Sequence, residues 1–247
     1  MVDFLDRDDQ DTVVFAEDVL KAAARHHIMV HFHGVWKPTG LDRTFPNLMN
    51  HEGALNLEYN KWGKLCTPEH DIDMAMTRLI AGPIDYHLGG FHAVPRDEFE
   101  PKFVGPSVMG TRAHQLGLYV VFDNPTPMVA DDPANYKNQP GFDFIKIVPT
   151  VWDETRVLET VPGRLFVTAR RKGQDWHIGA IAAGPKQKTE ISLDFLGDGE
   201  YEMTEWFDGP DGADPNVVLK ETKRVKKGDK VAFTMATDGG FVALLQR

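Results

Sequence analysis

Acidic side chains lie within or shortly after apolar segments near the start of the chain. Asp3 interrupts the apolar run of residues 2–5, and Asp6 follows it directly. Glu52 and Glu58 belong to the segment NHEGALNLEY. A carboxylate among apolar strand residues needs a partner or has a functional role, because burying an unpaired charge is costly. These acids are therefore the first candidates for proton-transfer or nucleophilic chemistry.

The segment IMVHFHG carries His31 and His33 at alternating positions, so a strand would place both imidazoles on one face. Metal sites use this spacing, but structural histidines and histidines that contact a substrate fit it equally well. No third and fourth ligand at zinc-type spacing is present. Trp36 follows the segment and could stack on a sugar or close the core.

The elements that position these residues begin with a predicted buried strand at residues 1–5. A helix is predicted over residues 12–27 from its apolar periodicity, with Asp11 or Thr12 as the cap. Residues 28–34 form a second predicted buried strand. The order strand, helix, strand indicates a parallel βαβ unit, in which functional residues gather at the carboxyl ends of the strands.

Residues 35–53 are predicted to form a long, functional loop, because this segment is rich in Pro, Gly and Asn. Helices are predicted at 69–82 and 111–123, with a short strand at 83–87 between them. This alternation of helices and strands continues to about residue 163 and predicts an α/β region.

Residues 164–247 change to paired β patterns and predict a C-terminal antiparallel β-sandwich. Three hairpins are expected, with the turns KGQD, LGDG and DGG, and the flanking segments are RLFVTARR with WHIGAIAA, TEISLDF with YEMTEWF, and KVAFTMAT with FVALLQ. Trp176 and Trp206 lie on these segments, where they are expected to be core residues of a supporting domain. A carbohydrate-binding module is the alternative.

Composition narrows the class of protein. The 247 residues are 42% hydrophobic and carry a formal charge of −10, which disfavours binding to nucleic acid or to an anionic membrane. The single cysteine, Cys66, excludes an internal disulfide framework. No apolar stretch is long enough to span a membrane, and the N-terminus lacks a secretory signal pattern.

Long motifs give the chain a specific resemblance. In order, the motifs are HGVWKPTGLDRTFPNLMNHEGALNLEY, PEHDIDMAMTRLIAGPIDYHLGG, GTRAHQLGLYVVFDNPTPMVADDPANY and VPTVWDETRVLETVPG. They resemble glycoside hydrolase family 97, which contains α-glucosidases and α-galactosidases. The resemblance implies the second half of a (β/α)8 barrel at residues 1–163 and a C-terminal β-sandwich at 164–247, as a fragment of a longer enzyme. Its parent is expected to be periplasmic or extracellular.

The resemblance also assigns catalytic roles. Glu58 aligns with the general acid, and Asp3 aligns with the nucleophile of retaining members, which lies in a Val-Asp-Phe context. Inverting members have His-Glu where this chain has His33-Gly34. We therefore expect a retaining α-glycosidase, an α-galactosidase rather than an α-glucosidase, that acts through a covalent glycosyl-enzyme intermediate. Retention requires carboxyl groups about 5 to 5.5 Å apart.

Glu52 aligns with a calcium-binding glutamate of the family. Calcium prefers six to eight oxygen ligands, so we expect the other ligands to come from a missing N-terminal part. Binding of an α-galactoside or another α-linked oligosaccharide is expected to involve a set of five residues, which are His31, His33, Trp36, Lys37 and Asp85. Most family members have GPMDYTPG where this chain has GPIDYHLGG. The alternative is a truncated, non-catalytic remnant or a sugar-binding protein.

Overall fold

Four segments of the N-terminal region run parallel, side by side and in chain order. In the computed structural model, which describes residues 1–247, β1 (Val30–Phe32) pairs with β2 (Leu48–His51). Isolated parallel bridges place Val2 beside β1 and Ile84 beside β2. The strand predicted at residues 1–5 is wrong beyond Val2, because left-handed backbone at Phe4 (φ +60°) ends the extended conformation. β2 lies within the segment predicted as loop.

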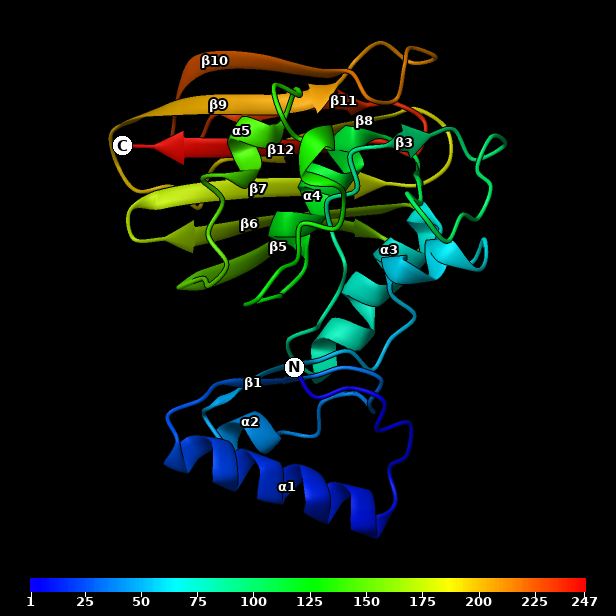
Figure 1. The fold of residues 1–247 in the computed structure, drawn as a ribbon. Helices are drawn as coiled ribbons and strands as arrows, with labels where there is room; N and C mark the ends of the chain where they lie inside the picture. Colours follow the sequence, from blue (N-terminus) through cyan, green and yellow to red (C-terminus); the bar gives the residue numbers. More distant parts are fainter.

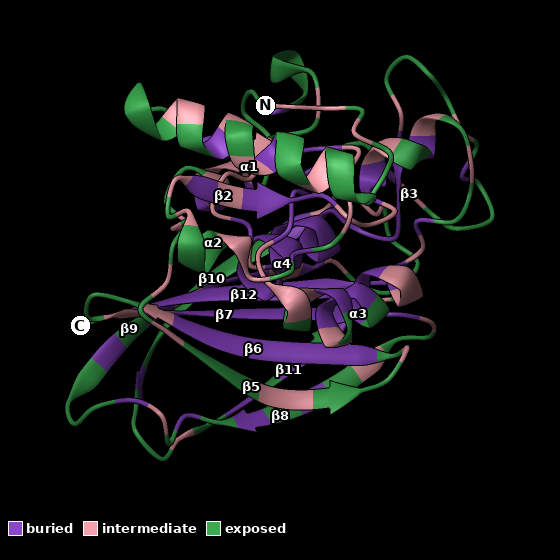
Figure 2. Cartoon of the chain, turned by 90° about the horizontal axis from the view of Figure 1, so that it is seen from below, coloured by how far each residue is buried: buried purple, intermediate pink, exposed green.

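Helix α1 (Gln10–Arg25) covers the outer side of these parallel segments (Figure 2). Its cap is Asp9, whose carboxylate accepts a hydrogen bond from the Thr12 amide at 3.0 Å. The predicted caps Asp11 and Thr12 are wrong, since both lie inside the first turn. Ala16 and Leu20 form the buried stripe of the helix and pack in a small core with the two strands.

The two later helices predicted from the sequence are both present. α3 (Pro68–Met76) is capped by Thr67 and α4 (Arg112–Val121) by Thr111. The helix predicted at 69–82 ends early, and its last turn becomes the 3-10 helix η2 (Arg78–Ala81). All ten residues of α4 are buried, because the helix lies over the large sheet (Figure 1) and between that sheet and the N-terminal region (Figure 2).

The C-terminal region is a β-sandwich. One sheet has six antiparallel strands in the order β10-β9-β12-β7-β6-β5, and β8 pairs with β11 in a second layer. The strand bounds are β5 Glu154–Val161, β6 Leu165–Lys172, β7 Asp175–Ala182, β8 Gln187–Ser192, β9 Glu200–Asp208, β10 Val218–Lys226, β11 Lys230–Met235 and β12 Gly240–Gln246.

The pairing of these strands differs from the predicted hairpins. β6 and β7 form the expected hairpin. The other two hairpins are wrong, because β8 pairs with β11 while β9 pairs with β10 and β12. Alternating buried and exposed residues show that a strand has one inner face, but they do not identify its neighbour. β5 pairs with β6, so the sheet begins before the boundary predicted at residue 163.

One continuous core joins the N-terminal region to the sandwich. It includes Ile72 of α3, Leu116 of α4 and Trp206 of β9, whereas Trp176 lies in the separate core between the two sheet layers. Both tryptophans are buried, as predicted for core residues. The remaining short elements are α2 Leu41–Thr44, η1 Leu57–Lys61, β3 Ala93–Val94, β4 Val108–Met109, η3 Pro133–Asn135 and α5 Phe142–Ile145. No helix is long and apolar enough to cross a bilayer.

Candidate active site

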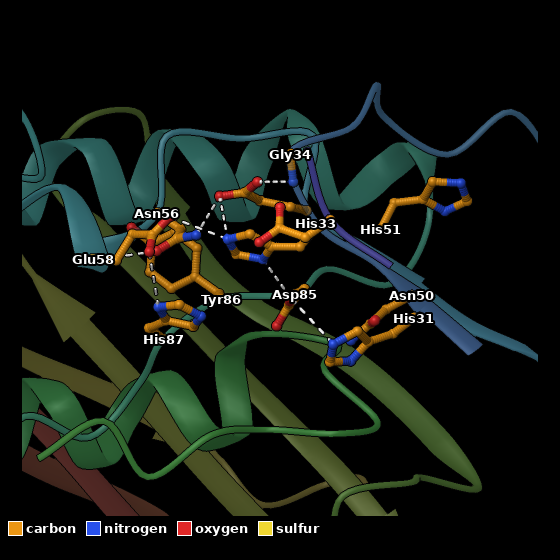
Figure 3. Close-up of polar contacts among 12 residues, drawn as sticks. His31, His33, Gly34, Asn50, His51, Asn56, Glu58, Asp85, Tyr86 and His87 are labelled. Atoms are coloured by element: carbon orange, nitrogen blue, oxygen red, sulfur yellow. Dashed lines mark hydrogen bonds and ion pairs between the residues drawn. The ribbon is translucent and has the colours of Figure 1, made fainter. Parts of the chain in front are cut away.

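The ends of three neighbouring parallel segments bring polar residues together. His33 follows β1, Glu52 follows β2 and Asp85 follows the bridge residue Ile84. Glu58 joins them from η1. Because parallel strands present their carboxyl ends at one edge, residues far apart in sequence meet there. Figure 3 shows His33 in the middle of this polar cluster, with Glu58 and Asp85 on different sides of its ring.

His33 bridges the carboxylates with both ring nitrogens. Its Nδ1 lies 2.7 Å from Asp85 Oδ2, and its Nε2 lies 3.1 Å from Glu58 Oε1 and 3.3 Å from Glu52 Oε1. The hydrogen bond to Asp85, aided by the one to Glu58, outweighs burial and raises the pKa of His33 to about 9. At neutral pH the ring is therefore a cation that donates from both nitrogens and compensates part of the surrounding negative charge.

Glu52 is held by backbone and amide donors. Its Oε2 accepts a hydrogen bond from the Gly34 amide at 2.7 Å, and its Oε1 accepts one from the Asn56 side chain. Burial raises the pKa of Glu52, partly opposed by the Gly34 hydrogen bond. Asn56 Oδ1 in turn caps η1 by accepting from the Glu58 amide at 2.8 Å. Asn56 therefore fixes the two glutamates relative to each other.

Arg78 is a positioning residue that the sequence motifs did not predict. Its buried guanidinium donates hydrogen bonds to backbone carbonyls on both sides of the cluster and has no carboxylate partner. The acceptors are the carbonyl oxygens of His51, Glu52, Gly53, Gly82 and Pro83. Arg78 therefore connects the end of β2 to the turn that precedes Asp85 through hydrogen bonds. An arginine within the apolar run MAMTRLIAG was the available signal.

His87 is a second residue of the site that was not predicted. Its ring stacks on His33 with a centroid distance of 5.2 Å and an interplanar angle of 7°. His87 Nδ1 lies 3.8 Å from Glu58 Oε2. Burial lowers the pKa of His87, partly opposed by Asp85 and Glu58. The departure of the HLGG segment from the family pattern was the signal that could have identified this residue.

Asp3 lies at the exit of the neighbouring segment, outside the hydrogen-bonded cluster. Its Oδ1 accepts a hydrogen bond from the Phe4 amide at 2.6 Å. The same oxygen lies against Gly34, where a Cβ atom, if one were present, would be only 2.9 Å away. Left-handed backbone at Gly34 (φ +51°) permits this close approach. Asp3 therefore approaches Gly34, whereas Glu58 binds the neighbouring His33, and no hydrogen bond joins the two acids.

The other predicted substrate-binding residues have different environments. His31 Nε2 is buried without a hydrogen-bond partner and lies 4.0 Å from Asp85 Oδ2, and burial lowers the pKa of His31. Asp85 is completely buried and orients His33. Trp36 is half-buried and packs against His51 at a centroid distance of 6.3 Å. Lys37 is exposed.

Known proteins resemble this chain at both ends and along its length. The family description "Glycoside hydrolase 97" matches residues 1–54, and "Glycosyl-hydrolase 97 C-terminal, oligomerisation" matches residues 151–246. A retaining alpha-galactosidase of Bacteroides thetaiotaomicron is 38% identical over 244 residues, which cover 97% of this chain and 37% of that protein. The chain therefore spans little more than a third of the length of this relative.

Solved structures agree with the family assignment. A glycoside hydrolase family 97 enzyme from Pseudoalteromonas sp. strain K8, in complex with acarbose, superposes with a TM-score of 0.87 and 36% identity, over 97% of this chain and 38% of that one. A beta-arabinopyranosidase superposes with a TM-score of 0.82 and 28% identity, over 98% of this chain and 38% of that one. The chain belongs to glycoside hydrolase family 97.

Proposed function

We propose that this chain carries the two catalytic carboxyl groups of a retaining α-glycosidase, with Asp3 as nucleophile and Glu58 as acid/base. The observation that supports this most is the contact of the Asp3 carboxylate with Gly34, the residue that follows His33, whose ring binds Glu58. A larger residue at position 34 would compete with Asp3 for this space. The Gly34 position therefore favours retention over the inverting arrangement.

In the proposed reaction, Asp3 attacks the anomeric carbon while Glu58 donates its proton to the glycosidic oxygen, and the bond between that carbon and oxygen breaks. The product of this step is a glycosyl ester on Asp3. Glu58, now ionised, takes a proton from water, and the resulting attack on the anomeric carbon releases Asp3. The His33 Nε2 lies 3.1 Å from Glu58 Oε1 and orients this carboxyl group for both steps.

The N-terminal region is proposed to be the second half of a (β/α)8 barrel. Val2, β1, β2 and Ile84 support this, because they are parallel and adjacent in chain order, as consecutive barrel strands are. An eight-stranded barrel typically needs about 250 residues, so the other strands would come from residues outside this chain.

An α-galactoside is the proposed substrate, since the related Bacteroides protein is named a retaining alpha-galactosidase. The similarity to a beta-arabinopyranosidase supports a second candidate within the same chemistry. A β-L-arabinopyranoside has the ring stereochemistry of an α-D-galactoside and lacks only the hydroxymethyl group. α-Glucosides are the third candidate.

Calcium is the proposed cofactor, with Glu52 as a ligand. His33, Glu52 and Glu58 present ligand atoms within 4.8 Å of one another. This set offers only two carboxylates, since the protonated His33 ring has no free nitrogen lone pair, whereas calcium takes six to eight oxygens, so the residues of this chain do not complete the site. The missing oxygens would come from outside the chain, and no catalytic step here depends on the ion.

Hydrolysis of an aryl α-galactoside, followed by NMR, tests the proposal. The assay uses the chain alone and the chain fused after the preceding part of the Bacteroides relative. We expect α-galactose as the first product, and at least a roughly 1,000-fold loss of the glycosylation rate in Asp3→Asn, on the scale of removing a nucleophile. β-Galactose as the first product would refute retention. Sugar binding without turnover in both forms would favour a non-catalytic sugar-binding protein.

A further inference from the structure

Glu58 lines a small cavity to which Glu52 and Asp85, the other partners of His33, do not contribute. Its volume is 150 Å³, and it lies between η1 and the loops at residues 106–108 and 128–130. Its polar lining residues are Glu58, Asn60, Lys61, His87 and Ser107. Ordinary ligand sites measure about 300 Å³ or more, so this cavity has room for part of one sugar residue.

Two buried polar atoms among the lining residues have no hydrogen-bond partner. Asn60 is 1% exposed, and its Nδ2 donates to the Ser107 carbonyl at 3.1 Å, whereas its Oδ1 is unpartnered. His87 Nε2 is also buried and unpartnered. Buried polar atoms are normally satisfied, and each one left without a partner costs roughly 1–3 kcal/mol. The pair therefore indicates a ligand that brings hydroxyl groups.

The backbone holds His87 in its place. Gly89 has left-handed backbone (φ +81°) and approaches Tyr119 so closely that a Cβ atom would overlap the tyrosine hydroxyl. The parallel stack with His33 orients the imidazole ring. The His87 ring is consequently held in one orientation, and a hydroxyl group that binds to its buried Nε2 displaces the groups that now cover this atom.

The location of the cavity relative to the two catalytic carboxyl groups indicates which part of the substrate it would bind. None of its lining residues comes from the segment that carries Asp3, whereas Glu58 lines it directly. A general acid faces the oxygen of the departing group, and the nucleophile faces the sugar that forms the intermediate. The cavity is therefore on the leaving-group side of the scissile bond.

We propose that Asn60 and His87 form a subsite that binds the hydroxyl groups of the leaving-group sugar, an inference that rests on the proposed glycosidase function. Asn60 Oδ1 accepts a hydrogen bond from one sugar hydroxyl, and His87 Nε2 pairs with a second. The subsite favours oligosaccharides over α-galactosides with a leaving group that has no hydroxyl groups.

The test compares melibiose, whose leaving group is glucose, with an aryl α-galactoside. In the active form of the protein, we expect His87→Phe to lower kcat/KM for melibiose about tenfold more than kcat/KM for the aryl galactoside, since any loss caused by disturbing Glu58 is common to both substrates. Phenylalanine retains the stack on His33 and removes the nitrogen. His87→Gln should recover most of the loss, and the exposed His92→Phe is the matched control.

Equal losses for both substrates would overturn the subsite, because His87 would then act only by positioning Glu58. No loss for either substrate would also overturn it. If wild type hydrolyses neither substrate, the proposed function fails. The subsite is then tested by a measurement of sugar binding. A shift of the His87 imidazole NMR signal with melibiose, but not with galactose, would then support the subsite, and no shift with melibiose would refute it.

Discussion

Replacement of Gly34 by alanine should disturb the proposed nucleophile more than any comparable change in the region. Gly34 has φ +51°, and the new Cβ would lie 2.9 Å from both Asp3 Oδ1 and the Phe4 amide nitrogen. Left-handed backbone costs a residue other than glycine about 1–2 kcal/mol. The contact with Asp3 adds to this cost, because one of the two groups must move.

The expected loss of unfolding free energy for Gly34→Ala is therefore about 2–4 kcal/mol, from backbone strain together with a displaced, overpacked neighbour. Gly40→Ala is the matched control, since Gly40 also has left-handed backbone (φ +91°) but no atom within 4 Å of the Cβ that alanine would add. The unfolding free energy of that variant should fall only by the cost of left-handed backbone, about 1–2 kcal/mol. Urea unfolding of both variants measures the difference.

Activity provides the second measurement. A displacement of about 1 Å at a reacting group can cost roughly 100-fold in rate, so kcat/KM for an aryl α-galactoside should fall by about that factor in Gly34→Ala. Gly40→Ala should stay within about threefold of wild type, since no atom lies within 4 Å of the Cβ that alanine would add at position 40. Equal stability and equal activity of the two variants would refute the argument that Gly34 makes room for Asp3.

Three further predictions concern charged and polar groups. Arg78→Lys should lower the unfolding free energy by about 3 kcal/mol in urea, because lysine cannot reach the five carbonyls that Arg78 binds, and unchanged stability would contradict this. Asp85→Asn should move the pKa of His33, measured by NMR titration, from about 9 toward its usual value, because the hydrogen bond to Asp85 is the largest cause of the shift. His177 is buried and burial lowers its pKa to about 4, so the unfolded chain binds its proton first and stability falls as the pH drops from about 6.5 to about 4, by roughly 3 kcal/mol. His177→Phe should remove part of this acid sensitivity, and an unchanged pH dependence of urea unfolding would refute the assignment.

Local signals in the sequence predicted several elements well. The helices predicted at 69–82 and 111–123 are present as α3 and α4, whose backbone hydrogen bonds join residues only a few positions apart. The KGQD turn joins β6 and β7, whose pairing requires no contact beyond the hairpin itself. These features depend on residues within a few positions of one another, so the local sequence is sufficient to predict them.

The remaining strands and their neighbours could not be predicted, because their pairing joins residues far apart in the sequence. The pattern of β8 is the same whether its neighbour is β9 or β11, because alternation reports only which face is buried. β2 was not predicted, since its short LMNH segment lies in a stretch rich in Pro, Gly and Asn, and its pairing with β1 overrides that local composition.

The amino-acid sequence by itself determined the family motifs and the presence of Glu52, Glu58 and Asp3 near strand ends. Only the tertiary structure decided that His33 lies between the carboxylates, that Asp85 is buried behind it and that His87 stacks on its ring. The reason is physical: hydrogen bonds and pKa shifts depend on distances of about 3 Å between residues that are far apart in the chain. The order of the parallel strands sets those distances.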